Sequence, residues 1–444
     1  MNKMKPLASA LIALGSIGLA ASALADSAVD AKIQELERQL QELKSQVASQ
    51  QQEIASNKTE LQAEIDEARP MAKGTKFTYG GFIQLDAIHS EYSEGKPNNL
   101  IEDFYVPAFV PVEPLTGNAD SYNSTNFSAK TSRFFFTTAT RTDAGTIGTR
   151  VELDFILSSQ GDERVSNSWS PRLRHAFVNW DYAEGGSILA GQSWSTFFNV
   201  AALPDLYDFI GPTGTIFLRQ PQIRWTMGGL QLAVENPATR LNDNTTTGDT
   251  YYNNGQQMPD LIARYNGKWN DLSWSAAAMG RELRYEQRAD ASDKGDSDDQ
   301  YGYALSFAGK WMFGRDDLRF MANFGDVLGR YMGINAFNDG YIKANGSIET
   351  FDQWGAFVAY QHYWSDRWRS TISASIAGAD NPDTNEYAGA DGLAKEYQSL
   401  HANLSWLPAP SLAIGGELIL ASKELEDGRD GDMSRVMFSV KYGF

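Results

Sequence analysis

The last twelve residues of the chain constrain its fold more than any other stretch. One parity of this segment is apolar or aromatic throughout: Val436, Phe438, Val440, Tyr442 and Phe444. Side chains alternate between the two faces of a strand, so the segment predicts a strand with one apolar and one mostly polar face. Such a long apolar strand is a poor edge for a sheet in water. It suits a closed barrel that faces lipid, in which the last strand pairs with the first, around residues 77–87.

Alternation with a period of two continues through the chain from residue 77. Sixteen segments of about ten residues show it, each with turn residues or a polar loop on either side. The predicted strands are 77–88, 130–141, 146–157, 172–182, 187–195, 219–227, 230–236, 259–268, 272–283, 301–313, 317–325, 351–362, 367–378, 396–407, 411–421 and 433–444.

The connections between these segments alternate between two kinds. Seven are tight and rich in Gly, Pro, Asp or Ser, and they alternate with eight longer, polar loops. Short turns at one rim and long loops at the other are typical of outer-membrane barrels. The fold class predicted here is therefore an all-β membrane protein, a 16-stranded antiparallel transmembrane β-barrel. An even strand number places both ends of the barrel domain at the short-turn rim, which is periplasmic in such barrels.

Charged residues indicate which parity faces the lumen. In segment 146–157, Arg150, Glu152 and Asp154 share one parity and apolar residues hold the other. An arginine that faced lipid at mid-depth would cost roughly 2–4 kcal/mol, so the polar parity is predicted to line water. The same reasoning places these residues inside: Asp86, Arg133, Arg224, Arg264, Arg281, Arg319, Arg369, Glu417 and Arg435. It places these on lipid: Phe134, Phe136, Trp225, Met227, Leu305, Phe307, Leu404, Trp406, Leu418 and Leu420.

One long connection, residues 196–220, differs from the others in its apolar content. It contains Phe197, Phe198 and Phe209, a Gly211-Pro212 turn, and the acids Asp205 and Asp208. Sixteen strands leave an aqueous channel, and an apolar loop can fold inward to narrow it. We expect this loop to form a constriction in which its acids face wall arginines. The alternative is a loop on the surface.

The N-terminal region precedes the barrel pattern. Residues 1–25 have a basic start, an apolar stretch and the small-x-small site Ala23-Leu24-Ala25, as a cleaved secretory signal peptide has. The alternative is an uncleaved N-terminal anchor helix. After residue 25 there is no run of 18 apolar residues that would predict a helical membrane span.

Residues 28–67 follow a heptad pattern. Position a is apolar throughout (Ile33, Leu40, Val47, Ile54 and Leu61), whereas position d turns polar halfway (Leu36, Leu43, Gln50, Asn57 and Glu64). This pattern predicts an α-helical coiled coil in a periplasmic segment, residues 26–70, ahead of the transmembrane β-barrel domain at 71–444. So narrow a stripe needs a partner helix, most simply another copy of the chain. A solvated spacer helix is the alternative.

Composition excludes several classes of protein. The chain has no Cys, which excludes a disulfide framework and thiol catalysis. Its net charge of −18 argues against nucleic acid as a partner. None of the four histidines lies in a catalytic motif, so we expect no enzyme activity and no cofactor. The aspartates of loop 290–299 do not have the spacing of a calcium loop, and a solvated acidic loop is favoured over a metal site.

Several segments resemble a known family. The exported heptad helix is followed by TYGGFIQLDA (78–87), SRFFFTTA (132–139) and GQSWS (191–195). In this order the segments resemble DcaP-like porins of Gram-negative outer membranes. The resemblance implies a homotrimer of sixteen-stranded barrels among outer-membrane lipid and lipopolysaccharide, with an N-terminal periplasmic coiled coil. It also implies diffusion of small anionic solutes, dicarboxylates in particular.

The functional hypothesis is therefore an anion-preferring porin. Arg133, Arg150, Arg224 and Arg264 are the predicted solute contacts, since guanidinium groups match carboxylates bidentately. Glu152 and Asp154 are predicted to line the same channel, and ion pairing with them is the alternative role of each arginine. The alternative function is a structural protein whose coiled coil links the barrel to the cell wall, with peptidoglycan as a partner.

Overall fold

The computed structural model describes residues 35, 38–47, 49–50, 74–97, 102–156, 169–182, 185–243, 250–253, 255–286 and 297–444. The chain separates into two compact units, Met1–Lys73 and Gly74–Phe444. The predicted signal peptide and most of the predicted coiled coil lie outside the described residues.

The first unit contributes one described stretch of helix. Residues 38–47 are helical, and their heptad positions Leu40, Leu43 and Val47 are exposed. Arg38 pairs with Glu35 and Glu42, one turn away on either side. The coiled coil remains a prediction. Within the described residues, no helix has the length and apolar character needed to cross a membrane.

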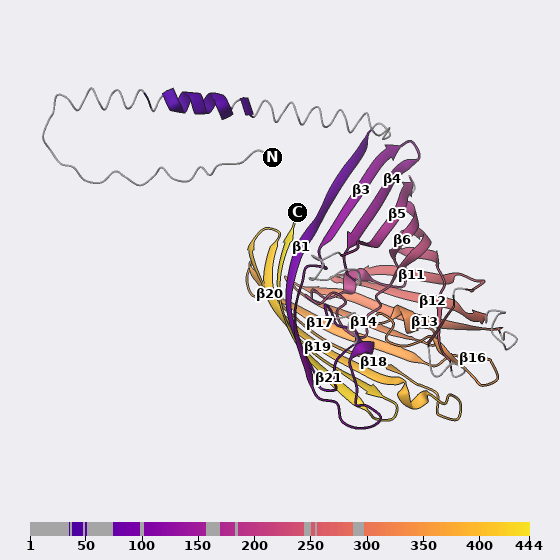
Figure 1. Ribbon diagram of the computed structural model, residues 1–444. Coiled ribbons are helices and arrows are strands. Elements are labelled where there is room, and N and C mark those ends of the chain that lie inside the picture. Colours follow the sequence, from indigo (N-terminus) through magenta and orange to yellow (C-terminus); the bar gives the residue numbers. More distant parts are fainter. Residues whose placement is uncertain are drawn as a thin grey trace, which may run out of the picture. The chain divides into compact units, whose positions relative to one another are not determined.

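The second unit is a closed barrel of sixteen antiparallel strands, as predicted (Figure 1). The last strand pairs with the first, from Gly443 opposite Phe82 to Met433 opposite Tyr92. The sixteen wall strands are β1 (Thr75–Tyr92), β3 (Arg133–Thr142), β4 (Gly145–Asp154), β5 (Arg172–Tyr182), β6 (Gly186–Trp194), β7 (Arg219–Met227), β8 (Leu230–Glu235), β11 (Asp260–Trp269), β12 (Leu272–Glu286), β13 (Ser297–Phe313), β14 (Asp316–Gly325), β17 (Gln353–Tyr363), β18 (Trp368–Ala379), β19 (Ala394–Ala409), β20 (Leu412–Leu425) and β21 (Asp430–Gly443).

The strands end near their predicted limits at the rim with short turns, which we call the turn rim. Asn270 and Ser411 hold positive φ values of 50° and 64° in two of these turns. At the opposite rim, the loop rim, several strands are longer than predicted. For example, β13 begins at Ser297 rather than at residue 301. Backbone pairing continues there through polar residues, after the apolar alternation that reveals a strand has ended.

One additional strand joins the wall. Strand β2 (Tyr122–Ser128) pairs with β1 from Asp86 to Tyr92, while β3 pairs with the other half of β1, from Thr75 to Phe82. At the break between β2 and β3, the Ser132 hydroxyl accepts a hydrogen bond from the Gln84 amide, and the Thr131 hydroxyl donates to Asp86. Side-chain hydrogen bonds thus replace the backbone hydrogen bonds to β1 at the point where its partner changes from β2 to β3.

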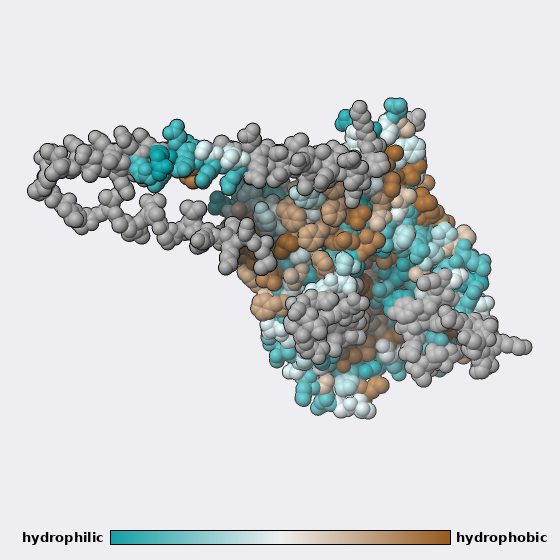
Figure 2. Space-filling view, turned by 45° about the horizontal axis from the view of Figure 1, so that its top comes forward, coloured by the Kyte–Doolittle hydropathy of each residue, from teal (hydrophilic) through white to brown (hydrophobic). Residues whose placement is uncertain are grey.

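The two parities face opposite sides, as the charges predicted. Asp86, Glu417 and Arg435 point inward and are buried, whereas Leu305, Leu404 and Leu418 are 43–50% exposed on the outer wall. Figure 2 shows hydrophobic side chains gathered over the wall, with hydrophilic side chains at its lower edge. This outer surface has the apolar character that a barrel in lipid requires.

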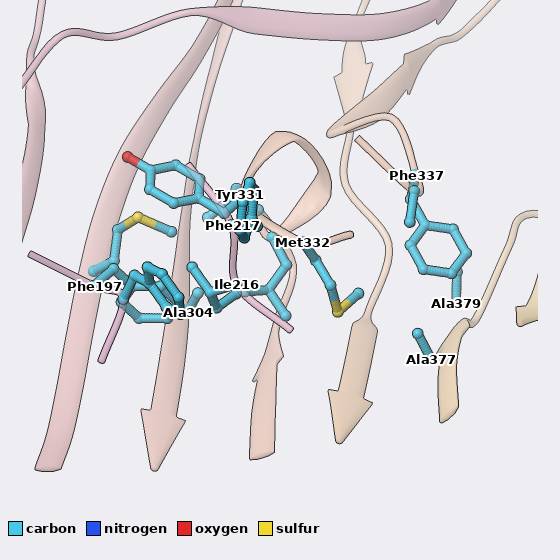
Figure 3. Packing of buried hydrophobic residues seen from close by; sticks show 14 of the residues in the cluster. Phe197, Ile216, Phe217, Ala304, Tyr331, Met332, Phe337, Ala377 and Ala379 are labelled. Carbon is cyan, nitrogen blue, oxygen red and sulfur yellow. The ribbon is translucent and has the colours of Figure 1, made fainter. Parts of the chain in front are cut away.

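The interior near the loop rim is filled by connections that fold inward. They include η2 (Pro107–Phe109), η4 (Val200–Ala202) and η5 (Gly329–Tyr331), and η6 (Ala390–Gly392) lies in a further connection. Four short strands form a second sheet in the order β10-β9-β15-β16: β9 (Thr239–Asp243), β10 (Thr250–Asn253), β15 (Gly340–Ile342) and β16 (Ile348–Glu349). Side chains from these connections form a hydrophobic core with inward residues of the wall (Figure 3).

Candidate functional site

The connection after β6, residues 195–218, lies inside the barrel, and we call it the first inward loop. Phe197 and Phe198 are each only 1% exposed, so the surface-loop alternative does not hold. Wall hydroxyls of the opposite side accept hydrogen bonds from its backbone amides. Ser399 Oγ lies 3.2 Å from Thr213 N, and Ser375 Oγ lies 2.7 Å from Gly214 N. The loop therefore crosses the lumen from the β6 side to β18 and β19.

Wall arginines hold the first inward loop from other directions. Arg264 Nη1 donates to the carbonyls of Thr196 (3.1 Å) and Phe198 (2.6 Å). Arg319 Nη1 donates to the carbonyl of Leu203 at 2.5 Å. Arg264, a predicted solute contact, thus also positions the loop.

A second inward loop, residues 326–352, packs on the first. Phe217 N donates to Tyr331 O, and Gly333 N donates to Thr215 O, both at 2.9 Å. Figure 3 shows Ile216 and Phe217 packed beside Tyr331 and Met332. The inward course of this loop was not predicted from the sequence. Its apolar content (Val327, Leu328, Tyr331, Met332, Ile334 and Phe337) was the available signal.

Four charged residues beneath the second inward loop form what we call the balanced cluster: Arg281, Arg330, Asp260 and Asp339. Arg281 pairs with Asp339 at 2.8 Å and with Asp260 at 3.3 Å, and Arg330 pairs with Asp260 at 2.8 Å. None of the four side chains is more than 8% exposed. Arg281 also donates to the carbonyls of Val327 and Ala238. Two cations and two carboxylates thus fix this loop to the wall.

Six other charged residues form a second group, the surplus cluster, on β3, β4 and β5: Arg133, Arg150, Arg172, Arg174, Glu152 and Asp154. Glu152 is bonded by Arg150 (2.5 Å) and Arg174 (2.8 Å), with Arg133 at 3.4 Å. Asp154 is bonded by Arg172 (2.8 Å) and Arg174 (2.7 Å). Four guanidinium groups therefore share two carboxylates, and Arg133, Arg150 and Arg172 remain 24–32% exposed. Among the described residues, the lumen wall therefore carries excess positive charge here.

Aromatic rings back several of these cations. Arg150 lies 4.3 Å from the Phe135 ring centroid, and Arg219 lies 4.2 Å from that of Trp194. Phe82 has Lys441 at 4.0 Å and Arg133 at 5.1 Å. Cation–π contacts stabilise a charge without neutralising it. Arg219 and Lys441 make no ion pair with any described residue.

Arg224 and Arg264, two of the predicted solute contacts, lie on β7 and β11. Both point inward, and across the described chain neither forms an ion pair with a carboxylate. Arg264 Nε is buried without a hydrogen-bond partner among those residues. These two positions therefore differ from Arg133 and Arg150, which share Glu152.

The two acids of the first inward loop have different surroundings. Asp205 pairs with Arg369 at 2.6 Å and accepts from Gln361 at 3.1 Å. Asp208 is buried and accepts from the backbone amides of Tyr105 (2.8 Å), Ile210 (3.0 Å) and Gly211 (3.1 Å). Burial raises the pKa of the Asp208 carboxyl. Asp208 thus organises the loop backbone, whereas Asp205 faces wall cations.

Other inward cations were not among the predicted site residues, and four of them lie in the surplus cluster or near the first inward loop: Arg172, Arg174, Arg219 and Lys441. Arg172 pairs with Asp154 just before a register shift between β4 and β5, and Arg174 lies in the shift, which brings Arg174 and His175 inward together. Their sequence signal was the Arg-x-Arg-His start of a predicted strand. Arg219 and Lys441 each lie close to the end of a strand. Strand limits are predicted poorly from sequence, so the height of these two residues along the barrel wall could not be predicted.

Comparison with known proteins identifies the family. The family model described as "DcaP outer membrane protein" matches residues 16–444. The chain belongs to this family. Members are outer-membrane proteins, so the DcaP-like barrel described here is an outer-membrane β-barrel. No match was found among curated proteins.

Solved structures show the same fold. The outer membrane channel DcaP of Acinetobacter baumannii superimposes with a TM-score of 0.66 at 21% identity, over 84% of this chain and 99% of that one. The anion-selective porin from Comamonas acidovorans gives a TM-score of 0.50 at 10% identity, over 83% of this chain and 100% of that one. At these identities the likeness concerns the fold. Family and fold together point to a porin channel rather than an enzyme.

No group of three or more His, Asp or Glu residues that could hold a metal ion occurs among the described residues. Most of the acidic loop 290–299 lies outside them.

Proposed function

We propose that this protein is a diffusion porin for small hydrophilic solutes, preferentially anions such as dicarboxylates. The observation that carries the proposal is the surplus cluster, in which four guanidinium groups share the carboxylates of Glu152 and Asp154. Arg219, Arg224 and Lys441 add inward positive charge with no carboxylate partner in the described part of the chain. The narrowing of the lumen by the first inward loop supports selection by charge at short range.

The magnitude of the attraction suits a channel. A pair of unit charges 4 Å apart is worth about 1 kcal/mol in bulk water and about 4 kcal/mol at an effective dielectric constant of 20. A dicarboxylate would exchange part of its hydration shell for guanidinium donors. This attraction would concentrate the dicarboxylate in the lumen. Conduction also requires that the solute leave, and several spaced, partly exposed arginines allow this better than one deep site.

Within this proposal each predicted residue has a role. Arg133, Arg150, Arg224 and Arg264 contact the anion. Glu152 and Asp154 hold the arginine side chains in place and moderate their charge. Asp205 and Asp208 belong to the constriction, Asp205 by its charge and Asp208 by ordering the loop.

The proposal extends to the assembly of the protein. We propose a homotrimer in outer-membrane lipid and lipopolysaccharide, with the turn rim and the N-terminal segment in the periplasm. The exposed Leu40, Leu43 and Val47 support a coiled coil between copies. The same stripe supports a second candidate function, a structural link to peptidoglycan. Deleting residues 26–70 separates the two functions: conductance survives, and wall association is lost only if the structural function exists.

The decisive experiment is the reversal potential of the purified protein in a planar bilayer under a KCl gradient, repeated with succinate. We expect a potential on the anion side and block of the chloride current by succinate. A potential on the cation side would mean that loop acids dominate selectivity. No conductance would leave the structural function.

A further inference from the structure

A cavity of about 310 Å³ lies inside the barrel, beside the tip of the first inward loop. Asp205, Leu206 and Tyr207 form its loop side, and strands β1, β18, β19, β20 and β21 form its wall side. Pockets for small ligands begin at about 300 Å³, so this cavity suits a solute of few atoms. The proposed function places its predicted anion contacts elsewhere, on β3, β4, β7 and β11.

Two cations line the wall side of this cavity. Arg369 Nη2 pairs with Asp205, but Arg369 Nε is buried without a hydrogen-bond partner in the described part of the chain. Lys441 Nζ lies 4.0 Å from the centroid of the Phe82 ring and forms no ion pair with any described residue. That N–H is enclosed, so the Lys441 ammonium group is the donor left for a ligand carboxylate, and the Arg369 side chain, which is 25% exposed, adds positive charge beside it.

A carboxylate lines the loop side of the same cavity. Asp205 Oδ2 forms an ion pair with Arg369 Nη2 at 2.6 Å and accepts a hydrogen bond from Gln361 Nε2 at 3.1 Å. Its Oδ1 has no hydrogen bond with another described residue, and the side chain is 41% exposed. This oxygen can accept a hydrogen bond from a cationic group. The Tyr207 hydroxyl is already used, since it donates to Ser405 Oγ at 2.9 Å.

We propose that this cavity is a subsite for small amphoteric solutes, which carry one carboxylate and one ammonium group as amino acids do. The solute carboxylate binds Lys441, with the charge of Arg369 beside it, and its ammonium group binds Asp205. A dicarboxylate gains the first contact but meets repulsion from Asp205 at its other end. The inference rests on the proposed function, because the solute must reach the cavity through a conducting lumen.

Liposome swelling tests the proposal with the full chain. Alanine is the amphoteric probe and lactamide, which has nearly the same size and no net or separated charge, is the neutral one. We expect alanine to enter several-fold faster than lactamide. Asp205→Asn and Lys441→Met should each bring the ratio of the two rates close to one. Asp205→Asn should also shift the KCl reversal potential further to the anion side, because it leaves the Arg369 charge unopposed.

Lys268→Met is the matched control. Lys268 lies on the inward parity of β11, is exposed, and does not line the cavity. This variant should keep the native alanine-to-lactamide ratio. Heat-modifiable migration on gels verifies that each variant is folded, and Asp205→Asn and Lys441→Met give two independent tests should one fail to fold.

The outcomes separate the subsite from the channel. Normal KCl conductance with equal rates for alanine and lactamide in the native protein would overturn the subsite and leave the porin function standing. An unchanged ratio in both folded cavity variants would overturn it as well. No conductance and no swelling with either probe would overturn the porin function and the subsite together.

Discussion

Arg174 and Arg281 are both inward-facing wall arginines with buried side chains, and both belong to ion clusters, yet the two clusters differ. Arg281 lies in the balanced cluster, where two arginines meet two aspartates beneath the second inward loop. Arg174 lies in the surplus cluster, where four arginines share Glu152 and Asp154. Three of those four remain partly exposed. Charge balance and cover by a loop, rather than residue type, thus separate an arginine that holds structure from one that can attract a solute.

Removing the centre of the balanced cluster should have the largest effect. Arg281→Met leaves Asp260 and Asp339 buried with less compensation, and breaking a buried pair in this way costs about 3–5 kcal/mol. We expect release of the second inward loop, seen as a higher single-channel conductance and a lower midpoint for heat modification. Arg315→Ala is the control, because Arg315 pairs with Asp366 at an exposed turn. Native conductance in Arg281→Met would show that the cluster does not hold the loop.

A smaller effect is expected at Asp208, which organises the first inward loop. Asp208→Ala leaves the amides of Tyr105, Ile210 and Gly211 without their acceptor, at a cost of about 1–3 kcal/mol. Asp208→Asn keeps an acceptor oxygen and should cost less. Thermal stability of both variants against the native protein measures the difference, and equal losses would contradict this role.

The buried Asp208 also makes the stability of the native protein depend on pH. Burial raises the pKa of Asp208 above its unfolded value, so folding favours the protonated carboxyl. Its stabilising contribution is therefore full below the ordinary aspartate range and is lost as pH rises through the raised pKa. Asp208→Asn, which is neutral at every pH, should lack this dependence. If the native protein and Asp208→Asn had the same dependence of stability on pH between pH 3 and 7, Asp208 would not have a raised pKa in the folded protein.

Within the surplus cluster, Arg150→Ala tests the predicted attraction of anions. At the bulk-water value, the substitution removes about 1 kcal/mol of attraction, roughly fivefold in local anion concentration. The reversal potential should move toward zero with no loss of folding, because Glu152 keeps Arg174 and Arg133. An unchanged reversal potential would remove Arg150 from the mechanism.

The smallest structural effect is expected at Arg224, which forms no ion pair with a described residue. Arg224→Ala should lower anion preference by a similar or smaller amount while leaving thermal stability within about 0.5 kcal/mol of the native protein. Arg264→Ala is the informative comparison. It removes the bonds to the Thr196 and Phe198 carbonyls, so stability and selectivity should change together. Identical behaviour of the two variants would show that Arg264 does not position the loop.

Much of the barrel was predictable because strand alternation is a local property. The parity of Val436–Phe444 reveals the outward face, and the order of turns and loops determines the strand number and the rims. Even the inward course of residues 195–218 could be predicted, since Phe197, Phe198 and Ile210 need burial. Predictions were least complete where polar residues continue a strand, as in β13, and where the wall changes from β2 to β3 and hydroxyl groups bond to β1 at the break.

The sequence by itself determined which side of the wall most strand residues occupy, because parity decides it wherever no register shift intervenes, as one does at Arg174 and His175. Only the tertiary structure decided which inward residues meet water. Arg281 and Arg150 have the same parity signal, but Val327 and Asp339, some fifty residues further along the chain, cover Arg281. The cavity beside Asp205 likewise brings together Lys441 and Arg369 from strands far apart in sequence. Such contacts depend on how distant loops pack inside the barrel, and no local pattern records them.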